Sequence, residues 1–462
     1  MRKFLILTLI VLGGAGIFFV FSKQPFQPIK SSLTEKNSSM TEASPILKEI
    51  TTPAGHSVWL APSEVPVVSV GIVFLGAGRR GSLQNPGLID LLTSMFHEGA
   101  GPYNSQAFKT LLLEKNIELS VQANFDNLII TFRTVKENIK DAFHILQLML
   151  TTPRFDDEDM VRVKQQVGSS LEQSLHDPRP VGLEALQRFV LGDNHPYNPR
   201  TIECIKNIPT LTAQQLRHYM ANHFTQSTVG IVAAGNISPE DLSDLVDPVV
   251  NSLNKTDTTS DIKELPYQNL GNSLNVHMDI PQTVIYFLQQ GINVNHPDFY
   301  AFYMINRILS NSFESRLWHE VREKRGLAYF CSTNLSHNDL NNVLTGITAT
   351  KTETVNETIQ IIKNEWEKLL EHGITKEELD FHKKNTMGSY SLNFSSTPGI
   401  VAILLWYKQR GLNIHDIHQR NSHIEKLTVE YINRVIKEHI KPKDLVFVTI
   451  GKYQTAPVGG PR

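Results

Sequence analysis

The chain is poor in cysteine and has no excess of charge of either sign. Its 462 residues include two cysteines, Cys204 and Cys331, far apart and without C-x-x-C spacing. This excludes a thiolate metal site and a disulfide framework as the basis of the fold. The formal net charge is -2, with acidic and basic residues mixed along the chain. The sequence therefore predicts no surface for nucleic acids or anionic membranes.

Low-complexity tracts are also missing. The hydrophobic fraction of 40% and the charged fraction of 19% indicate a packed, water-soluble body rather than a disordered or fibrous chain. A chain of 462 residues is too long for one ordinary core, so two or three folding units are expected.

The amino terminus carries a long apolar run. Arg2 and Lys3 precede the run Phe4–Phe21, which only Thr8 and a few glycines interrupt. Its length approaches the roughly 20 residues that span a bilayer, and no A-x-A-like cleavage site ends it. An uncleaved anchor is therefore favoured over a cleaved signal peptide. The positive-inside bias keeps Arg2 and Lys3 in the cytoplasm, so everything after Lys23 is expected to be exported.

The rest of the sequence predicts an α+β protein made of two similar domains. Strand-like runs and helical patterns follow one another in the same order in both halves. The predicted strands are Val67–Leu75, Leu128–Val135, Thr228–Ala234, Thr283–Leu288 and Leu344–Thr350, and a helix is expected to begin at Pro239. The predicted division is an anchor (1–23), a polar stalk (24–46), a first domain (47–253), a linker (254–272), a second domain (273–455) and a tail (456–462).

Two pairs of positions support an internal duplication. Gly168-Ser169 and Gly388-Ser389 lie 220 positions apart, and the glycines after the closing strands, Gly235 and Gly451, lie 216 apart. A near-constant offset of this size indicates two copies of one domain rather than a solenoid, whose repeats are far shorter.

One amphipathic helix in the first domain is expected to face a cleft. Asn85-Pro86 predicts its start and Gly99 its end. Its buried stripe is predicted to consist of Leu88, Leu91, Leu92, Met95 and Phe96. The other face carries Asp90, Thr93, Ser94 and His97.

The segment from Pro86 to Met95 resembles the zinc-binding helix of the pitrilysin/insulinase-type peptidases. In that family the helix carries H-x-x-E-H, with two histidine ligands and a glutamate as general base. The resemblance places Asp90, Thr93 and Ser94 at the three motif positions, so the whole motif is expected to be lost. It places the family's third ligand, a glutamate, in the stretch Gln165–Glu172. No zinc is expected on this chain.

The residues alone leave two alternatives for this helix face. The first is a polar face turned to solvent or to a partner. The second is a substitute metal site that combines Asp90 and His97 with a distant carboxylate. Those two residues are two helical turns apart, about 10.5 Å of rise, which is too far for direct chelation of one ion.

The string SRLWHEVREKRGLAY, Ser315–Tyr329, resembles the second domain of the same family. In its two-chain bacterial members one subunit carries the zinc motif, and the other carries an arginine and a tyrosine seven residues apart that reach toward bound substrate. The matching residues are Arg322 and Tyr329. A guanidinium and a phenol can both donate hydrogen bonds to a peptide carbonyl or a developing oxyanion. Without the resemblance, Arg322 would be assigned to a solvated helix face and Tyr329 to a strand in the core.

The resemblance covers residues 47 to 455 and implies half of a clamshell-shaped dimer around a peptide-sized chamber. It implies a substrate-binding subunit, inactive alone, of a zinc metallopeptidase whose zinc lies on a sister chain. Peptides would be the substrates, and the body would face the periplasm from a bacterial inner membrane, or be periplasmic if the first segment is cleaved. Two alternatives stay open: a peptidase-fold scaffold at the membrane, and an independent metallopeptidase with unusual ligands.

Overall fold

The computed structural model describes residues 45–255, 266–310 and 314–453. Several predicted segments lie outside these described residues: the anchor 1–23, the stalk up to residue 44, residues 256–265 of the linker, and the tail 456–462. No helix within the described ranges is long and apolar enough to cross a membrane. The anchor and its orientation therefore stay predictions.

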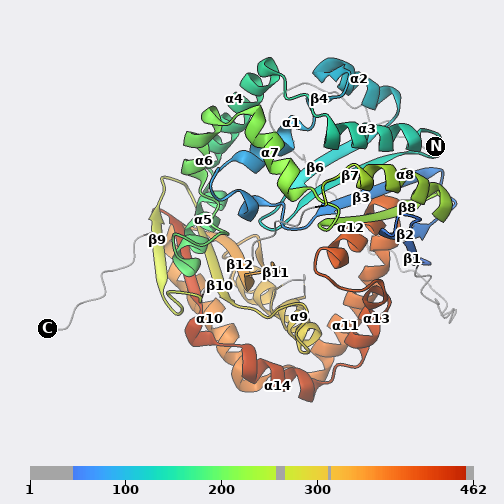
Figure 1. Cartoon of the computed structure of the whole chain (residues 1–462). Coiled ribbons are helices and arrows are strands. Elements are labelled where there is room, and N and C mark those ends of the chain that lie inside the picture. The colour runs from blue at the N-terminus through green and yellow to red at the C-terminus, as the bar shows by residue number, and fades with distance from the viewer. Residues whose placement is uncertain (1–44, 256–265, 311–313, 454–462) are drawn as a thin grey trace, which may run out of the picture. The chain divides into compact units, whose positions relative to one another are not determined.

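The first half of the chain forms a six-stranded sheet of order β1-β2-β8-β3-β7-β6 (Figure 1). Its strands are β1 (Lys48–Thr51), β2 (Ser57–Pro62), β3 (Val67–Phe74), β6 (Glu118–Ala123), β7 (Leu128–Val135) and β8 (Val229–Gly235). β2 and β8 pair in parallel, and the other neighbours are antiparallel. Every residue of β3 after Val67 is buried, because this central strand is covered on both faces.

The second half repeats this topology with one strand fewer. Its sheet has the order β11-β12-β10-β13-β9, and the strands are β9 (Ser273–His277), β10 (Thr283–Gln290), β11 (Cys331–His337), β12 (Asn342–Thr350) and β13 (Val446–Gly451). Read from β9, this order matches β2-β8-β3-β7-β6, and the parallel pair, β9 with β13, falls in the matching place. The prediction of two similar α+β halves is confirmed.

The helices also occupy matching places along the two halves. The first half contains α1 (Leu88–Met95), α2 (Ser105–Glu114), α3 (Ile139–Thr151), α4 (Asp157–Ser174), α5 (Pro178–Leu191), α6 (Thr201–Asn207), α7 (Ala213–His223) and α8 (Pro239–Asn251). The second contains α9 (Phe299–Leu309), α10 (Val355–His372), α11 (Lys376–Tyr390), α12 (Thr397–Lys408), α13 (Ile414–Glu425) and α14 (Val429–His439). Gly168-Ser169 lies in α4 and Gly388-Ser389 in α11, so α9 and α11 correspond to α1 and α4.

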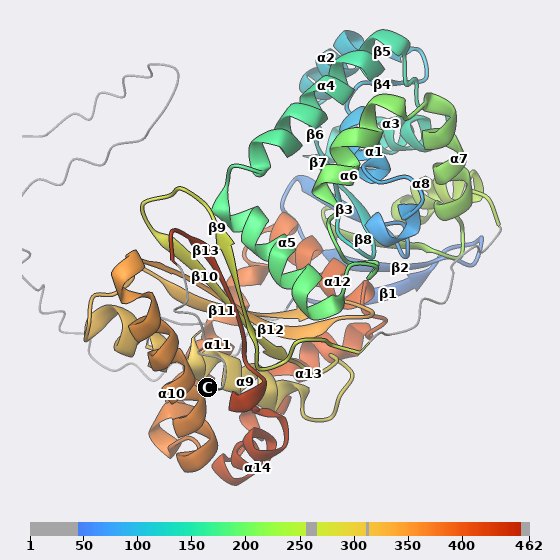
Figure 2. The same cartoon turned by 90° about the vertical axis from the view of Figure 1, so that its left-hand side faces the viewer.

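Each half contributes one helix that packs on the sheet of the other half. Helix α5 packs on β10 and β13, whereas α12 packs on β3 and β8 (Figure 2). Glycine allows both close approaches, since a Cβ at Gly182 would lie 2.4 Å from Cδ1 of Ile450 and one at Gly71 would lie 2.6 Å from Cδ1 of Leu405. The exchange binds the two halves into one unit, and no local sequence pattern predicted it.

Two of the predicted element boundaries are confirmed, and one predicted helix start is wrong. Strand β7 has the predicted bounds, and α8 begins at Pro239 as expected. The predicted start of the first helix at Asn85-Pro86 is wrong, because Gly87 has φ +81° and the helix begins only at Leu88. Its predicted apolar stripe is nevertheless fully buried.

Candidate functional site

Helix α1 presents Asp90 to an arginine rather than to open solvent. Nη2 of Arg79 lies 2.7 Å from Oδ1 of Asp90, and Nε donates to the same oxygen at 3.3 Å. The Asp90 side chain is 18% exposed. Burial opposes the charge of Arg79, but its pairing with Asp90 outweighs burial and raises the pKa of Arg79. The carboxylate at this position is therefore already neutralised by a guanidinium.

Thr93 and Ser94 bond back to their own helix. The Thr93 hydroxyl donates to the carbonyl oxygens of Ile89 and Asp90, at 3.0 and 3.1 Å, and the Ser94 hydroxyl donates to the carbonyl of Asp90 at 2.9 Å. Both side chains are half-buried. Such bonds are ordinary for hydroxyl residues inside helices. One neutralised carboxylate and two hydroxyls do not fit a catalytic zinc ion, which takes three histidine, cysteine or carboxylate ligands.

The stretch Gln165–Glu172 lies on α4, which packs against α1. Glu172 is exposed and lines a surface hollow beside Val161 and Ile208. Asp90 lines a different hollow, beside Arg79 and Cys204. The structure therefore does not bring Glu172 and Asp90 into one ligand set.

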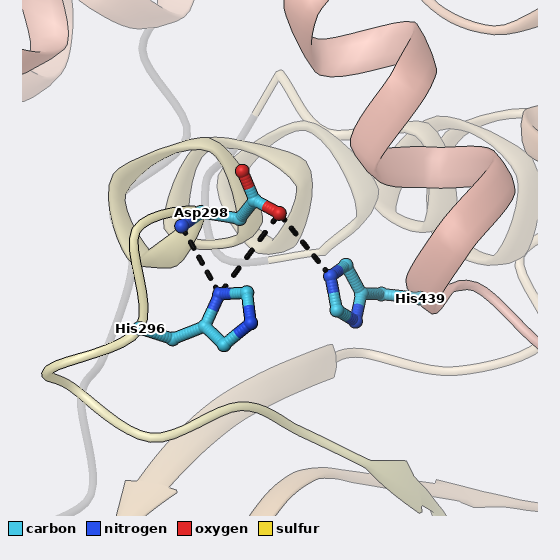
Figure 3. A group of neighbouring side chains, drawn as sticks. All are labelled: His296, Asp298 and His439. Atoms are coloured by element: carbon cyan, nitrogen blue, oxygen red, sulfur yellow. Dashed lines mark hydrogen bonds and ion pairs between the residues drawn. The ribbon is translucent and has the colours of Figure 1, made fainter.

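A histidine and aspartate cluster that the sequence did not reveal lies in the second half (Figure 3). It consists of His296 and Asp298, just before α9, and His439 at the end of α14. Within the described ranges it is the one group whose donor atoms could hold a metal ion, all lying within 4.8 Å of one another. Oδ2 of Asp298 is 3.9 Å from Nδ1 of His296 and 3.4 Å from Nε2 of His439. His439 lies far along the chain from His296 and Asp298, so spacing along the sequence gave no signal for the complete cluster.

Asp298 already forms an ion pair with Arg434. Nη2 of Arg434 lies 2.6 Å from Oδ1 of Asp298, and the Tyr431 hydroxyl donates to that oxygen at 2.5 Å. Burial raises the pKa of Asp298, but the bonds from Tyr431, Arg434 and His439 outweigh burial and lower it. These contacts tie α14 to the start of α9. Since a metal would have to share this carboxylate with Arg434, we assign the cluster a structural role.

The family-like segment of the second half is anchored by Arg316. Its guanidinium binds the Glu378 carboxylate of α11 with two bonds of 2.7 and 2.8 Å, and it donates to the Gly373 carbonyl at 2.8 Å. Paired bonds of this kind are among the stronger polar contacts in proteins. The next turn, Trp318–Glu323, is a π-helix, a rare geometry that often occurs at functional sites.

Glu320 of this turn forms ion pairs with residues that follow the turn, whereas Arg322 forms none with a described residue. Glu320 accepts from Lys324 and Arg325 at 2.5 Å each. Burial opposes the charge of Glu320, but these two donors lower its pKa to about 2. Arg322 is exposed, has no ion pair among the described residues, and stacks with its Cζ 4.1 Å from the ring centre of Trp318. Its guanidinium is held over an aromatic face with its donors available.

A glycine turn then brings Tyr329 to the surface. Gly326 has φ +61°, its N–H donates to the carbonyl of Arg322 at 3.0 Å, and the N–H of Leu327 donates to that of Val321 at 2.9 Å. This is the bonding of a glycine-capped helix end. The Tyr329 side chain is 81% exposed, so the alternative of a core strand aromatic is wrong. Strand β11, at an edge of its sheet, begins two residues later.

Comparisons with known proteins agree with this fold. The profile described as "Insulinase (Peptidase family M16)" matches residues 59–198, and "Peptidase M16 inactive domain" matches residues 210–386. The crystal structure of a peptidase M16 inactive domain from Pseudomonas fluorescens superposes with a TM-score of 0.82 at 23% identity, covering 89% of this chain and 98% of that one.

Two relatives carry different descriptions. "Non-peptidase homolog YmxG" of Helicobacter pylori is 23% identical over 390 residues, which cover 84% of this chain and 89% of that protein. "Uncharacterized zinc protease YmxG" of Bacillus subtilis is 24% identical over 338 residues, 71% of this chain and 80% of that protein. The chain belongs to the M16 peptidase (insulinase) family.

Proposed function

We propose that this chain is the non-catalytic, substrate-binding subunit of a heterodimeric zinc metallopeptidase that degrades peptides. Its partner is a sister subunit of the same family, and that subunit holds the zinc. Arg322 and Tyr329 are the substrate-binding residues, and Asp90, Thr93 and Ser94 are the remnants of the lost zinc motif.

The contrast between the two candidate sites carries this proposal. In the first half, Asp90 is engaged by Arg79 and the two hydroxyls are engaged by their own helix. In the second half, Arg322 and Tyr329 are both exposed, whereas neighbouring charges are paired, Glu320 with Lys324 and Arg325, and Arg316 with Glu378 of α11. This distribution supports a chain that contacts the substrate and leaves the metal chemistry to its partner.

The chain's own groups would act on the substrate backbone. A zinc ion on the sister subunit supplies an activated water when bound. The Arg322 guanidinium and the Tyr329 hydroxyl donate hydrogen bonds to a peptide carbonyl, positioning it and stabilising negative charge on its oxygen. Strand β11, which begins two residues after Tyr329 at an edge of its sheet, would pair with an extended peptide.

The test is cleavage of a quenched fluorescent peptide library by the complex that co-purifies with the tagged chain. Arg322→Ala combined with Tyr329→Phe is expected to lower kcat/KM at least a hundredfold, the usual cost of removing an oxyanion donor. The matched control is Arg325→Ala, which removes a neighbouring arginine that is paired with Glu320 and should change kcat/KM less than about threefold. Unchanged cleavage by the double variant would remove the proposed role.

The alternative is a peptidase-fold scaffold at the membrane. The description of the Helicobacter pylori relative as a non-peptidase homolog favours it. It predicts a stable complex with a partner outside the peptidase family, and a complex that cleaves no member of the library.

We also propose that residues 1–23 anchor the chain in a bacterial inner membrane, with the body in the periplasm. The support is the apolar run after Arg2 and Lys3. Protease added to spheroplasts should then digest the body. Protection of the body until the membrane is lysed would place it in the cytoplasm.

A further inference from the structure

The second half encloses a cavity of about 560 Å³ between α9, β11, α11, α12 and α13. Ligand pockets usually fall between roughly 300 and 1,000 Å³. Aromatic and polar side chains share its wall: the aromatic residues include Tyr300, Tyr303, Tyr390, Trp406 and Tyr407, and five asparagines lie among the other lining residues. It lies beside α9 and α11, the counterparts of α1 and α4, yet it includes none of the residues assigned to the proposed cleavage role.

One cation on this wall is buried without a counter-ion. The Arg420 residue is 9% exposed, and no carboxylate of the described residues lies within ion-pairing distance of it. Its guanidinium donates to the side-chain oxygen of Asn421 at 2.8 Å and to the Tyr303 hydroxyl at 3.4 Å, and its Cζ lies 4.0 Å from the ring centre of Tyr390. A guanidinium has more N–H donors than these two bonds use. Buried charges are normally paired, so the missing anion requires an explanation.

Three other polar atoms on the wall have no hydrogen-bond partner among the described residues. They are Nδ1 of His337 and the hydroxyls of Thr386 and Tyr390, and all three are buried. Burial, reinforced by the nearby charge of Arg410, lowers the pKa of His337 to about 4, so its imidazole is neutral at pH 7. The cavity thus combines one fixed cation with neutral polar atoms and aromatic surface.

The charges around the cavity favour a monoanion. Besides Arg420, its wall includes Asp416 and His423. Asp416 accepts the backbone N–H of Asn413 at 2.7 Å as part of the α13 cap, and its negative charge disfavours a doubly charged ligand such as a phosphate monoester. The planar fork of an arginine matches a carboxylate with two parallel bonds.

We propose that this cavity binds a ligand with one carboxylate on a hydrophobic, aromatic-sized body, and that the Arg420 guanidinium receives the carboxylate. Both the C-terminal residue of a peptide and a free arylalkyl carboxylic acid have this chemistry. The site goes beyond the proposed cleavage role and does not depend on it, because its residues belong to this chain alone.

The test is calorimetric titration of the purified full-length chain with four probes: glycyl-phenylalanine, its C-terminal amide, phenylpropionate and inorganic phosphate. At least one free carboxylate should bind, and the amide at least tenfold more weakly than glycyl-phenylalanine if the dipeptide binds. Binding of the dipeptide alone supports a peptide C-terminus, and binding of phenylpropionate supports a free acid. Binding of neither carboxylate, or equal binding of phosphate, would overturn the proposal.

Variants separate the site from general effects on folding. Arg420→Met should weaken carboxylate binding at least tenfold. Ser389→Trp should do the same by filling the cavity from an exposed position on its wall, without removing a buried group. Lys426→Met, which removes an exposed positive charge just after α13, is the matched control and should bind like the parent chain. Unchanged binding by folded Arg420→Met would refute the assignment.

Discussion

Two buried charges, Glu98 in the first half and Arg420 in the second, have opposite surroundings. In the first half Glu98, 6% exposed, accepts from Ser105, Lys109 and Arg162 at 2.5, 2.8 and 2.5 Å. In the second half Arg420 is buried to a similar degree beside the 560 Å³ cavity, and it forms no ion pair with a carboxylate of the described residues. A charge that is satisfied by its own chain serves the fold, whereas a charge left unsatisfied beside open volume indicates a ligand.

The largest expected effect on stability comes from the satisfied charge. Burial opposes ionisation of Glu98, but bonds from Lys109, Ser105 and Arg162 lower its pKa to about 2. Glu98→Gln should therefore lower the free energy of unfolding at pH 7 by about 3 kcal/mol. Urea unfolding followed by circular dichroism measures this loss.

The same depressed pKa gives the loss a pH dependence. The contribution of Glu98 is fully present above the ordinary carboxyl pKa of 4.5 and disappears as the pH falls toward 2. The difference between parent and Glu98→Gln should thus shrink between pH 5 and 3. Glu118→Gln, at a side chain that is 70% exposed, is the control and should change stability by less than about 0.5 kcal/mol. A gap that stays constant with pH would contradict the assignment.

The helix exchange between the halves should be the next most sensitive feature. Gly182→Val in α5 forces atoms toward Ile450 and Tyr286, which a Cβ alone would approach to 2.4 and 2.7 Å. Overpacking of this kind costs about 1–3 kcal/mol. Thermal unfolding should show a lower midpoint and one transition, since both sheets share the contact. An unchanged midpoint would mean that α5 does not pack on the second sheet.

The duplicated glycines offer a smaller, matched comparison. Gly168 in α4 and Gly388 in α11 are helical, and a Cβ at either would meet nothing within 4 Å. Glycine to alanine at each should therefore raise the free energy of unfolding by about 0.5–1 kcal/mol, with similar gains in the two halves. Denaturant titration of both variants measures it, and a loss at one site alone would show that the halves differ there.

The smallest effect on stability is expected at the unsatisfied charge. Arg420→Met loses the contacts with Tyr390 and Tyr303 but also removes a buried, unpaired cation, so the free energy of unfolding without ligand should change by less than about 1 kcal/mol. Denaturant titration beside Glu98→Gln gives the direct comparison. A loss above about 3 kcal/mol would mean that Arg420 is satisfied within the fold.

The sequence predicted local features well and long-range packing poorly. The bounds of β7 and the start of α8 followed from residues that are neighbours along the chain. The exchange of α5 and α12 depends on contacts between Gly182 and Ile450 and between Gly71 and Leu405. No local periodicity records such contacts.

The candidate site residues show the same difference between what the sequence predicted and what only the fold revealed. Arg322 and Tyr329 are predicted as site residues because a long string resembles a family, and the structure shows both side chains exposed. Arg420 was missed, although a signal existed: it lies three residues after Ile417 and four before Ile424, on the buried stripe of α13. A positively charged residue on the apolar stripe of a predicted helix is a candidate binding residue in any sequence, because a buried charge is normally paired.

We propose that the zinc ion is bound by the sister subunit and not by this chain. Zinc per chain, measured by mass spectrometry on the chain alone and on the complex that co-purifies with it, tests this claim most directly. The His439→Gln variant identifies any zinc held by the His296, Asp298 and His439 cluster. We expect no zinc on the chain alone and one zinc ion per complex. Stoichiometric zinc on the isolated chain that survives His439→Gln would contradict this proposal.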